Sequence, residues 1–184
     1  MRKPLNFCMK LLKDEGIAAL EFALILPILI LILFGTFEIS RYAYLYQKIQ
    51  QGTVGINQIT GMNQLRVCDL QSLLNNAGMF FQPFDINANG SIIATGVSNN
   101  GTKTLVTWQQ FSPKAATSAI GLVGATAKLP TGFTIASGDS AIFVEVFYTY
   151  TPLFNTIFTG PQQVYRMAVT KPRTGSAATL AACP

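Results

Sequence analysis

The first third of the chain changes from a continuous apolar run to an alternating apolar and polar pattern. Between Gly16 and Glu38 the only charged residue is Glu21. As a helix, residues 17–37 would extend about 31 Å, enough to cross the hydrocarbon core of a bilayer. A secretory signal would have a shorter apolar run followed by a small-residue cleavage site. The pattern therefore predicts a retained membrane-spanning segment over residues 17–38.

The next segment has the apolar periodicity of an amphipathic helix. Its apolar positions recur at spacings of three, four or seven: Tyr42, Leu45, Ile49, Ile56 and Ile59. We expect the helix to continue over residues 39–66, with Gly52, Gly55 and Gly61 weakening its far end. Pro27 removes one backbone hydrogen bond and should kink the membrane-spanning part.

The sequence pattern over residues 67–184 predicts a small domain that contains an antiparallel sheet. The expected strands are Ser91–Thr95, Thr104–Phe111, Ala141–Tyr150 and Val164–Thr170, with turns at Asn89-Gly90 and Asn100-Gly101. Both faces of the third strand are largely apolar, which indicates a central position in the sheet. A short helix Leu70–Asn76 should be capped by Asp69 and end at Gly78. Residues 112–134, rich in Gly, Ala, Thr and Pro, predict a long loop. The expected fold class is α+β, with the long N-terminal helix packed on the sheet.

Composition excludes several classes of function. Of 184 residues, 49% are hydrophobic and only 11% are charged, and the net charge of +5 comes from scattered basic residues. Nucleic-acid binding would need a clustered basic footprint. The chain has no histidine, which removes the usual general base and the commonest metal ligand. With no nucleophile motif either, we expect neither an enzyme nor a metal or cofactor site.

The start of the apolar run combines three features that point to a function. Basic residues precede it, at Arg2, Lys3, Lys10 and Lys13, which should keep the N-terminus in the cytoplasm and place residues 67–184 beyond the membrane. An ionisable side chain such as Glu21 near bilayer depth costs roughly 3 kcal/mol on insertion scales. A cost of this size calls for a partner, and cleavage after Gly16 would create one as a new α-ammonium group. The alternative is that Glu21 lies close enough to the interface to stay hydrated or to protonate.

These residues resemble a known family. Gly16 followed by four apolar residues and Glu21 is similar to the type IV prepilin cleavage and assembly motif. Residues 21–27, Glu-Phe-Ala-Leu-Ile-Leu-Pro, followed by Phe34-Gly35 and Glu38, resemble the TadE-like pseudopilins of the tight-adherence (Tad/Flp, type IVb/IVc) pilus system. The close resemblance covers roughly residues 13 to 48. Major Flp pilins are much shorter and have Glu-Tyr where this chain has Glu21-Phe22, which favours a minor pilin or pseudopilin.

The resemblance implies a pilin-like fold and a processing step. A prepilin peptidase would remove a leader of residues 1–16 by cutting between Gly16 and Ile17. The new amine would pair with Glu21 of a neighbouring subunit, with Phe22 beside it in the assembly segment. Expected partners are the peptidase, other pilin subunits, the inner-membrane Tad assembly machinery and membrane lipid. The expected location is the bacterial inner membrane, or a surface pilus used in adhesion or secretion. The alternative is an uncleaved single-span envelope protein whose outer domain binds a partner.

The cysteine pair and the aromatic residues of the predicted strands can each be interpreted in two ways. Without residues 1–16 the cysteines are Cys68 and Cys183, a pair that predicts one disulfide in an extracytoplasmic compartment, or else two free thiols. Trp108, Tyr148 and Tyr150 would form either an exposed adhesive patch or, more commonly for aromatic residues at strand spacing, part of the core.

Overall fold

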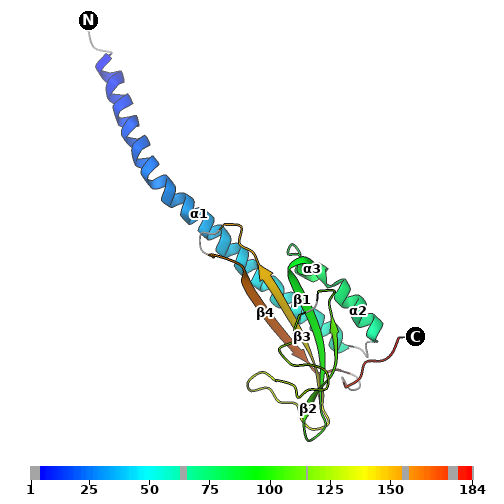
Figure 1. Cartoon of the computed structure of the whole chain (residues 1–184). Coiled ribbons are helices and arrows are strands. Elements are labelled where there is room, and N and C mark those ends of the chain that lie inside the picture. The colour runs from blue at the N-terminus through cyan, green and yellow to red at the C-terminus, as the bar shows by residue number, and fades with distance from the viewer. Residues whose placement is uncertain (1–4, 63–65, 115, 155–157, 174–177, 184) are drawn as a thin grey trace. The chain divides into compact units, whose positions relative to one another are not determined.

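The computed structural model describes residues 5–62, 66–114, 116–154, 158–173 and 178–183, with side chains from residue 16 onward. The chain divides into two compact units. The first comprises residues 1–41 and 152–160, and the second comprises residues 42–151 and 161–184. The long helix α1 runs from Leu5 to Met62 and contributes to both units (Figure 1). The predicted continuation to residue 66 includes residues 63–65, which lie outside the described residues, and a second helix begins at Val67.

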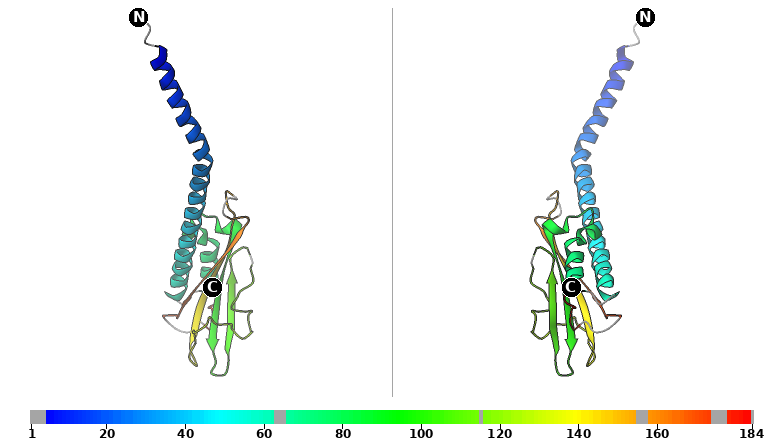
Figure 2. Two further views of the ribbon diagram at one scale, coloured as in Figure 1. Left: turned by 90° about the vertical axis from the view of Figure 1, so that its left-hand side faces the viewer. Right: turned by 90° about the vertical axis from the view of Figure 1, so that its right-hand side faces the viewer.

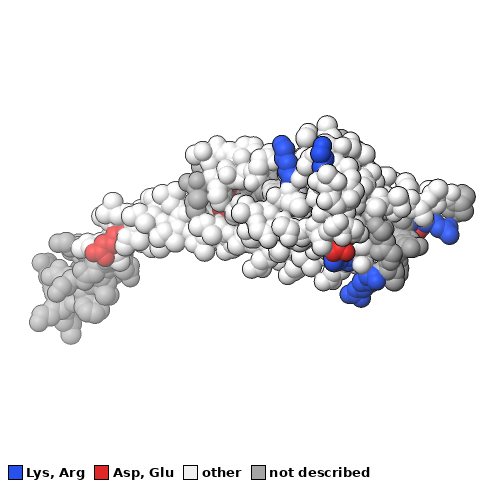
Figure 3. Space-filling model, turned by 90° about the horizontal axis from the view of Figure 1, so that it is seen from below, with Lys and Arg blue, Asp and Glu red and all other residues white. Residues whose placement is uncertain are grey.

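The first unit contains the apolar part of α1. Most large apolar side chains from Ile17 to Phe37 are exposed, and Figure 3 shows this part of the surface with few charged atoms. Over Gly16–Met62 the helix is long and apolar enough to cross a membrane, by length and composition. It continues through Pro27 without interruption, and the kink expected there stays a prediction.

The second unit is built on a four-stranded antiparallel sheet in the order β2-β1-β3-β4. The strands are β1 (Gly90–Asn99), β2 (Thr104–Phe111), β3 (Ser140–Tyr150) and β4 (Gln162–Thr170). The predicted α+β class and the interior position of β3 are confirmed. Asn100 closes the β1–β2 hairpin by accepting backbone N–H bonds from Thr102 and Lys103 at 3.0 and 2.9 Å. The turn expected at Asn89-Gly90 was wrong, because a short helix α3 (Ile86–Asn89) leads directly into β1.

One face of the sheet is covered by helices. Figure 2 shows α2 and the C-terminal part of α1 on the same side of the strands. Leu45, Ile49 and Ile56 of α1 are buried, which confirms most of the predicted stripe, while Ile59 is exposed. Gly52 belongs to the same stripe, and a Cβ there would lie 2.5 Å from Cε1 of Phe81. Gly52 therefore permits close packing, a role that its low helix propensity did not reveal.

The opposite face of the sheet is covered by the irregular segment between β2 and β3. Its residues Ile120 and Ile135 form one core cluster with Val97, Val106, Ala141 and Phe143. Phe133 packs edge-on against Phe143, with ring centroids 5.6 Å apart. The described residues of the segment 112–134 thus form the long loop that the composition predicts, and they cover a hydrophobic core on this face of the sheet.

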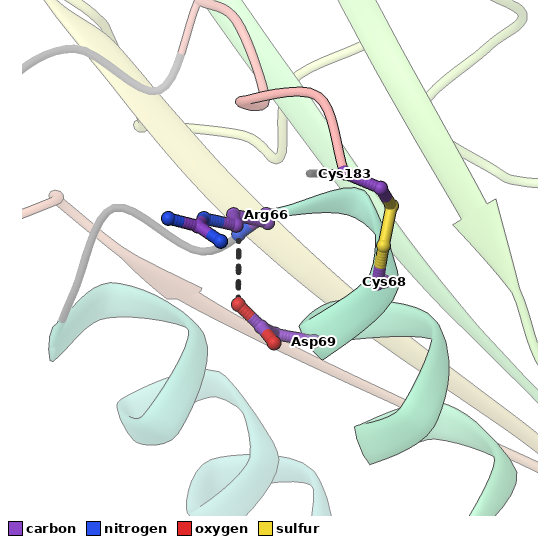
Figure 4. Close-up of a disulfide and its surroundings, with 4 residues drawn as sticks. All are labelled: Arg66, Cys68, Asp69 and Cys183. Carbon is purple, nitrogen blue, oxygen red and sulfur yellow. Dashed lines mark hydrogen bonds between the residues drawn. A yellow bond between two sulfur atoms is a disulfide. The ribbon is translucent and has the colours of Figure 1, made fainter.

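Short elements connect α1 to the sheet. Helix α2 spans Val67–Asn75 and begins three residues before the predicted start. Asp69 therefore lies in the first turn, and it caps the helix from there, because its carboxylate accepts the backbone N–H of Arg66 at 3.4 Å (Figure 4). Gly78 does not end this helix but lies within a 3₁₀ helix η1 (Ala77–Phe81). Asp85 caps α3 by accepting the N–H groups of Asn87 and Ala88 at 3.0 Å each.

The aromatic residues of the strands lie inside the second unit. Trp108, Tyr148 and Tyr150 are all buried. Tyr150 packs edge-on against Tyr42 of α1, with ring centroids 5.3 Å apart. Trp108 lies over Gly96, where a Cβ would approach the indole Nε1 to 2.1 Å. The core interpretation is therefore correct, and the adhesive patch is excluded for these three residues.

Candidate functional site

The Gly16–Glu21 junction lies on the exposed surface of α1. Gly16, Ile17, Glu21 and Phe22 are all exposed. A Cβ added to Gly16 would meet no atom within 4 Å. Packing within the described part of the chain therefore does not require glycine at this position. If glycine is required here, the reason must be an interaction with another molecule.

Glu21 lies on the helix surface among apolar side chains. Its neighbours Leu20, Phe22 and Leu24 are all more than half exposed. A carboxylate in this setting would face hydrocarbon in a bilayer and other helices in a fibre. Both environments favour a carboxylate that has a cationic partner over one that has none.

A second carboxylate of α1, Glu38, has a different setting. Its side chain is fully buried, with 0% exposed. Oε1 and Oε2 each accept the backbone N–H of Leu153 at 3.3 Å, and Oε2 also accepts that of Phe154 at 3.2 Å. Residues 152–160 belong to the same compact unit as this part of α1. Glu38 therefore fastens the loop after β3 to the helix.

This role of Glu38 was not predicted from the sequence. One signal was available, since Glu38 precedes Tyr42, Leu45 and Ile49 by four, seven and eleven residues. These are the spacings of a single helical stripe. A charged residue in phase with an apolar stripe indicates a buried charge with partners elsewhere in the chain.

A disulfide cross-links two segments of the second unit. Cys68 in the first turn of α2 is bonded to Cys183 near the C-terminus, with Cα atoms 5.8 Å apart (Figure 4). This is the pair expected from the sequence, and the separation lies within the usual range for disulfides. The backbone N–H of Val67 also donates to the carbonyl of Ala181 at 3.0 Å. The C-terminal tail is thus attached to the start of α2 by a covalent bond and a hydrogen bond.

The described part of the chain offers little for catalysis. Within it, no group of three or more His, Cys, Asp or Glu residues could hold a metal ion. A pocket of about 240 Å³ is lined by Ser91 and Lys114, among others. The Lys114 ammonium there donates to the carbonyl of Ala88 at 2.7 Å, and the Ser91 hydroxyl donates to the carbonyl of Lys114 at 2.5 Å. Both side chains are therefore engaged in hydrogen bonds to nearby backbone carbonyl groups.

Comparison with known proteins places the junction and Glu38 in one family segment. Residues 16–53 match the TadE-like protein family. The match confirms the resemblance predicted from the Gly16 and Glu21–Glu38 residues. Searches of curated proteins and of solved structures gave no match. The TadE-like segment begins at the expected cleavage residue, contains both carboxylates of the apolar helix and ends at residue 53 within α1, before the first strand.

Proposed function

We propose that the chain is a minor pilin or pseudopilin of a tight-adherence pilus system, with a structural role and no catalytic one. The observation that carries this proposal is the TadE-like match, which starts at Gly16 and covers the whole apolar part of the helix. The long exposed apolar helix and the compact disulfide-bonded second unit agree with it. Such a subunit would use the helix first to span the inner membrane and then to pack against other helices in a fibre.

The proposed processing step cuts the chain between Gly16 and Ile17. Helix α1 includes both residues, so a peptidase would have to unwind the helix locally to reach this bond. Glycine helps in two ways, since it has no side chain to obstruct the peptidase and it disfavours the helix by about 1 kcal/mol relative to alanine. The lack of any packing role for Gly16 supports this explanation.

Cleavage would give Glu21 its partner. The new α-ammonium of Ile17 and the Glu21 carboxylate of an adjacent subunit would neutralise each other in a medium of low dielectric constant. Each charge alone is expensive there, and pairing offsets much of that penalty. The pair would also fix the axial register between subunits, with Phe22 packing beside it. The N-terminus would be cytoplasmic before cleavage, and the second unit extracytoplasmic.

Determination of the mature N-terminus tests the proposal. Protein extracted from membranes of cells with the prepilin peptidase should begin at Ile17, and protein from cells without it near Met1. Gly16→Leu should retain the leader in both strains. A start near Met1 in the presence of an active peptidase would support the uncleaved single-span protein instead.

A further inference from the structure

The loop that Glu38 holds extends the apolar surface of α1. Phe154 packs against Phe34 and Phe37, with ring centroids 4.5 and 6.2 Å apart. Leu153 is 58% exposed, and Phe37 and Ile39 on the helix are 51% and 52% exposed. All of these residues belong to the first unit. The apolar surface of the helix therefore continues onto a second segment of the chain, more than a hundred residues away in sequence.

Several polar groups in this region have hydrogen-bond partners within the unit. The Glu38 carboxylate accepts the backbone N–H groups of Leu153 and Phe154. On the exposed side of the helix, the Thr36 hydroxyl donates to the carbonyl of Ile32 at 2.7 Å, and the Ser40 hydroxyl to that of Thr36 at 2.8 Å. Non-helical backbone at the edge of a membrane needs such internal partners, because lipid supplies none. The Glu38 carboxylate supplies these partners for the loop at Leu153 and Phe154.

The position of the loop along the helix matches the edge of the hydrocarbon layer. Residues 17–37 extend about 31 Å, close to the thickness of about 30 Å of a bilayer core. Glu38 and its loop therefore come directly after the end of the membrane-spanning run. We propose that the loop at Pro152–Phe154 inserts into the interfacial layer of the bilayer that α1 crosses, with Leu153 as the lipid-contacting side chain and Glu38 as the residue that positions it.

This lipid contact would give the membrane-embedded subunit a second attachment point beside its helix. It depends on the membrane span alone, and it holds for a cleaved pilin and for an uncleaved anchor. A test of the loop therefore fails or succeeds independently of the N-terminal cleavage.

Quenching by brominated lipid tests the proposal. The full chain carrying Leu153→Trp is reconstituted into vesicles of phosphatidylcholine brominated in its acyl chains. The unsubstituted chain gives the background from Trp108, and Leu122→Trp gives a matched control at an exposed leucine of the second unit. Insertion to interfacial depth should reduce the emission of the tryptophan introduced at position 153 by roughly half, with little quenching by aqueous iodide. The control should show the reverse.

Two results would overturn the proposal. One is iodide quenching of the Leu153→Trp chain equal to that of the Leu122→Trp chain. The other is protection from both quenchers that increases with the protein-to-lipid ratio, which would place a second copy of the chain over Leu153.

The role of Glu38 is tested by combining Leu153→Trp with Glu38→Ala. Loss of the carboxylate leaves two N–H groups without their acceptor, so the loop should leave the interface and become accessible to iodide. Asp139→Asn, which changes an exposed carboxylate of the second unit, should leave the lipid quenching unchanged. Near-ultraviolet circular dichroism of each variant shows whether the second unit remains folded. Lipid quenching that persists in the folded Glu38→Ala chain would exclude Glu38 as the positioning residue.

Discussion

The hydroxyl of Tyr165 on β4 donates a hydrogen bond of 3.0 Å to Oε1 of Glu145 on β3. The same carboxylate accepts the backbone N–H of Ala119 at 2.9 Å and the hydroxyl of Ser118. Glu145 is fully buried in the middle of the sheet. A buried carboxylate is tolerated when several donors replace its lost water. Here the donors come from a neighbouring strand and from the covering loop, so Glu145 fastens that loop to the sheet.

Glu145→Gln should destabilise the second unit by about 1–3 kcal/mol, because the amide group would direct N–H bonds toward groups that are themselves donors. Denaturant unfolding of the full chain in detergent, followed by tryptophan fluorescence, measures this change. Asp139→Asn, which removes an exposed ion pair with Lys171, should change the free energy of unfolding by less than about 1 kcal/mol. Equal effects of the two substitutions would contradict the role assigned to Glu145.

Stability should also fall at alkaline pH. Burial, followed by the charge of Glu145 and its hydrogen bond, raises the pKa of Tyr165 well above its usual value. In the unfolded chain this tyrosine loses its proton near pH 10 while the folded chain keeps it. The stabilisation is therefore complete below about pH 10 and is lost as pH rises above it. Comparison of unfolding free energies with those of Tyr165→Phe isolates this contribution, because the substitution should flatten the alkaline slope.

The disulfide should be a main contribution to the stability of the second unit. Cys68 and Cys183 are 115 residues apart in sequence, and cross-links that close long loops restrict the unfolded chain most. Cys68→Ser should lower the free energy of unfolding by roughly 2–5 kcal/mol. Thermal unfolding with and without a reductant measures the effect. Cys8→Ser lies outside the bonded pair and should leave the transition unchanged, and a loss of stability in that variant would point to a different pairing.

Two glycines of α1 provide a matched pair of substitutions. Gly52→Ala would drive a methyl group to 2.5 Å from the buried ring of Phe81, whereas the nearest atom to a methyl group at Gly55 would be 3.8 Å away on Phe80. Overpacking typically costs about 1–3 kcal/mol, so Gly52→Ala should destabilise the chain. Gly55→Ala should instead stabilise it by up to about 1 kcal/mol through helix propensity. The same direction of change in both would show that α1 does not pack as closely at Gly52 as described.

Glu21→Ala should separate processing from assembly. The substitution leaves Gly16 and Ile17 intact, so the peptidase should still produce a mature N-terminus at Ile17. Without the carboxylate, the new amine has no partner on the adjacent subunit, and incorporation into the fibre should be lost. N-terminal sequencing and quantification of the subunit in sheared pili measure the two steps. Normal incorporation of the alanine variant would exclude the assembly role of Glu21.

Local patterns in the sequence were sufficient to predict much of the fold. β2 was predicted with its observed bounds, since it follows the Asn100-Gly101 turn and is rich in strand-forming side chains. The apolar stripe of α1 correctly marked Leu45, Ile49 and Ile56 as core. These features depend on neighbours within one helix or strand, which is the range over which periodicity carries information.

Features that depend on distant partners could not be predicted in this way. Gly52 looked like a weak point of the helix because the approach of Phe81 has no local signature. Glu145 interrupts an apolar strand, and nothing adjacent to it in sequence indicates its donors at residues 118, 119 and 165. Asp69 was placed before α2, whereas it lies in the first turn and accepts the N–H of Arg66. Nothing near the start of this helix in sequence indicates its backbone bond between Val67 and Ala181.

The contact between Glu38 and the loop at Leu153 also has a consequence for the order of biosynthesis. The ribosome makes Glu38 115 residues before its first partner, which corresponds to roughly ten seconds at ordinary rates of translation. During this interval the helix can already enter the membrane while the carboxylate at its end has no loop to hold. The bonds between Glu38 and residues 153 and 154 can form only after β3 has been synthesised, so they are a late event that marks a nearly complete subunit.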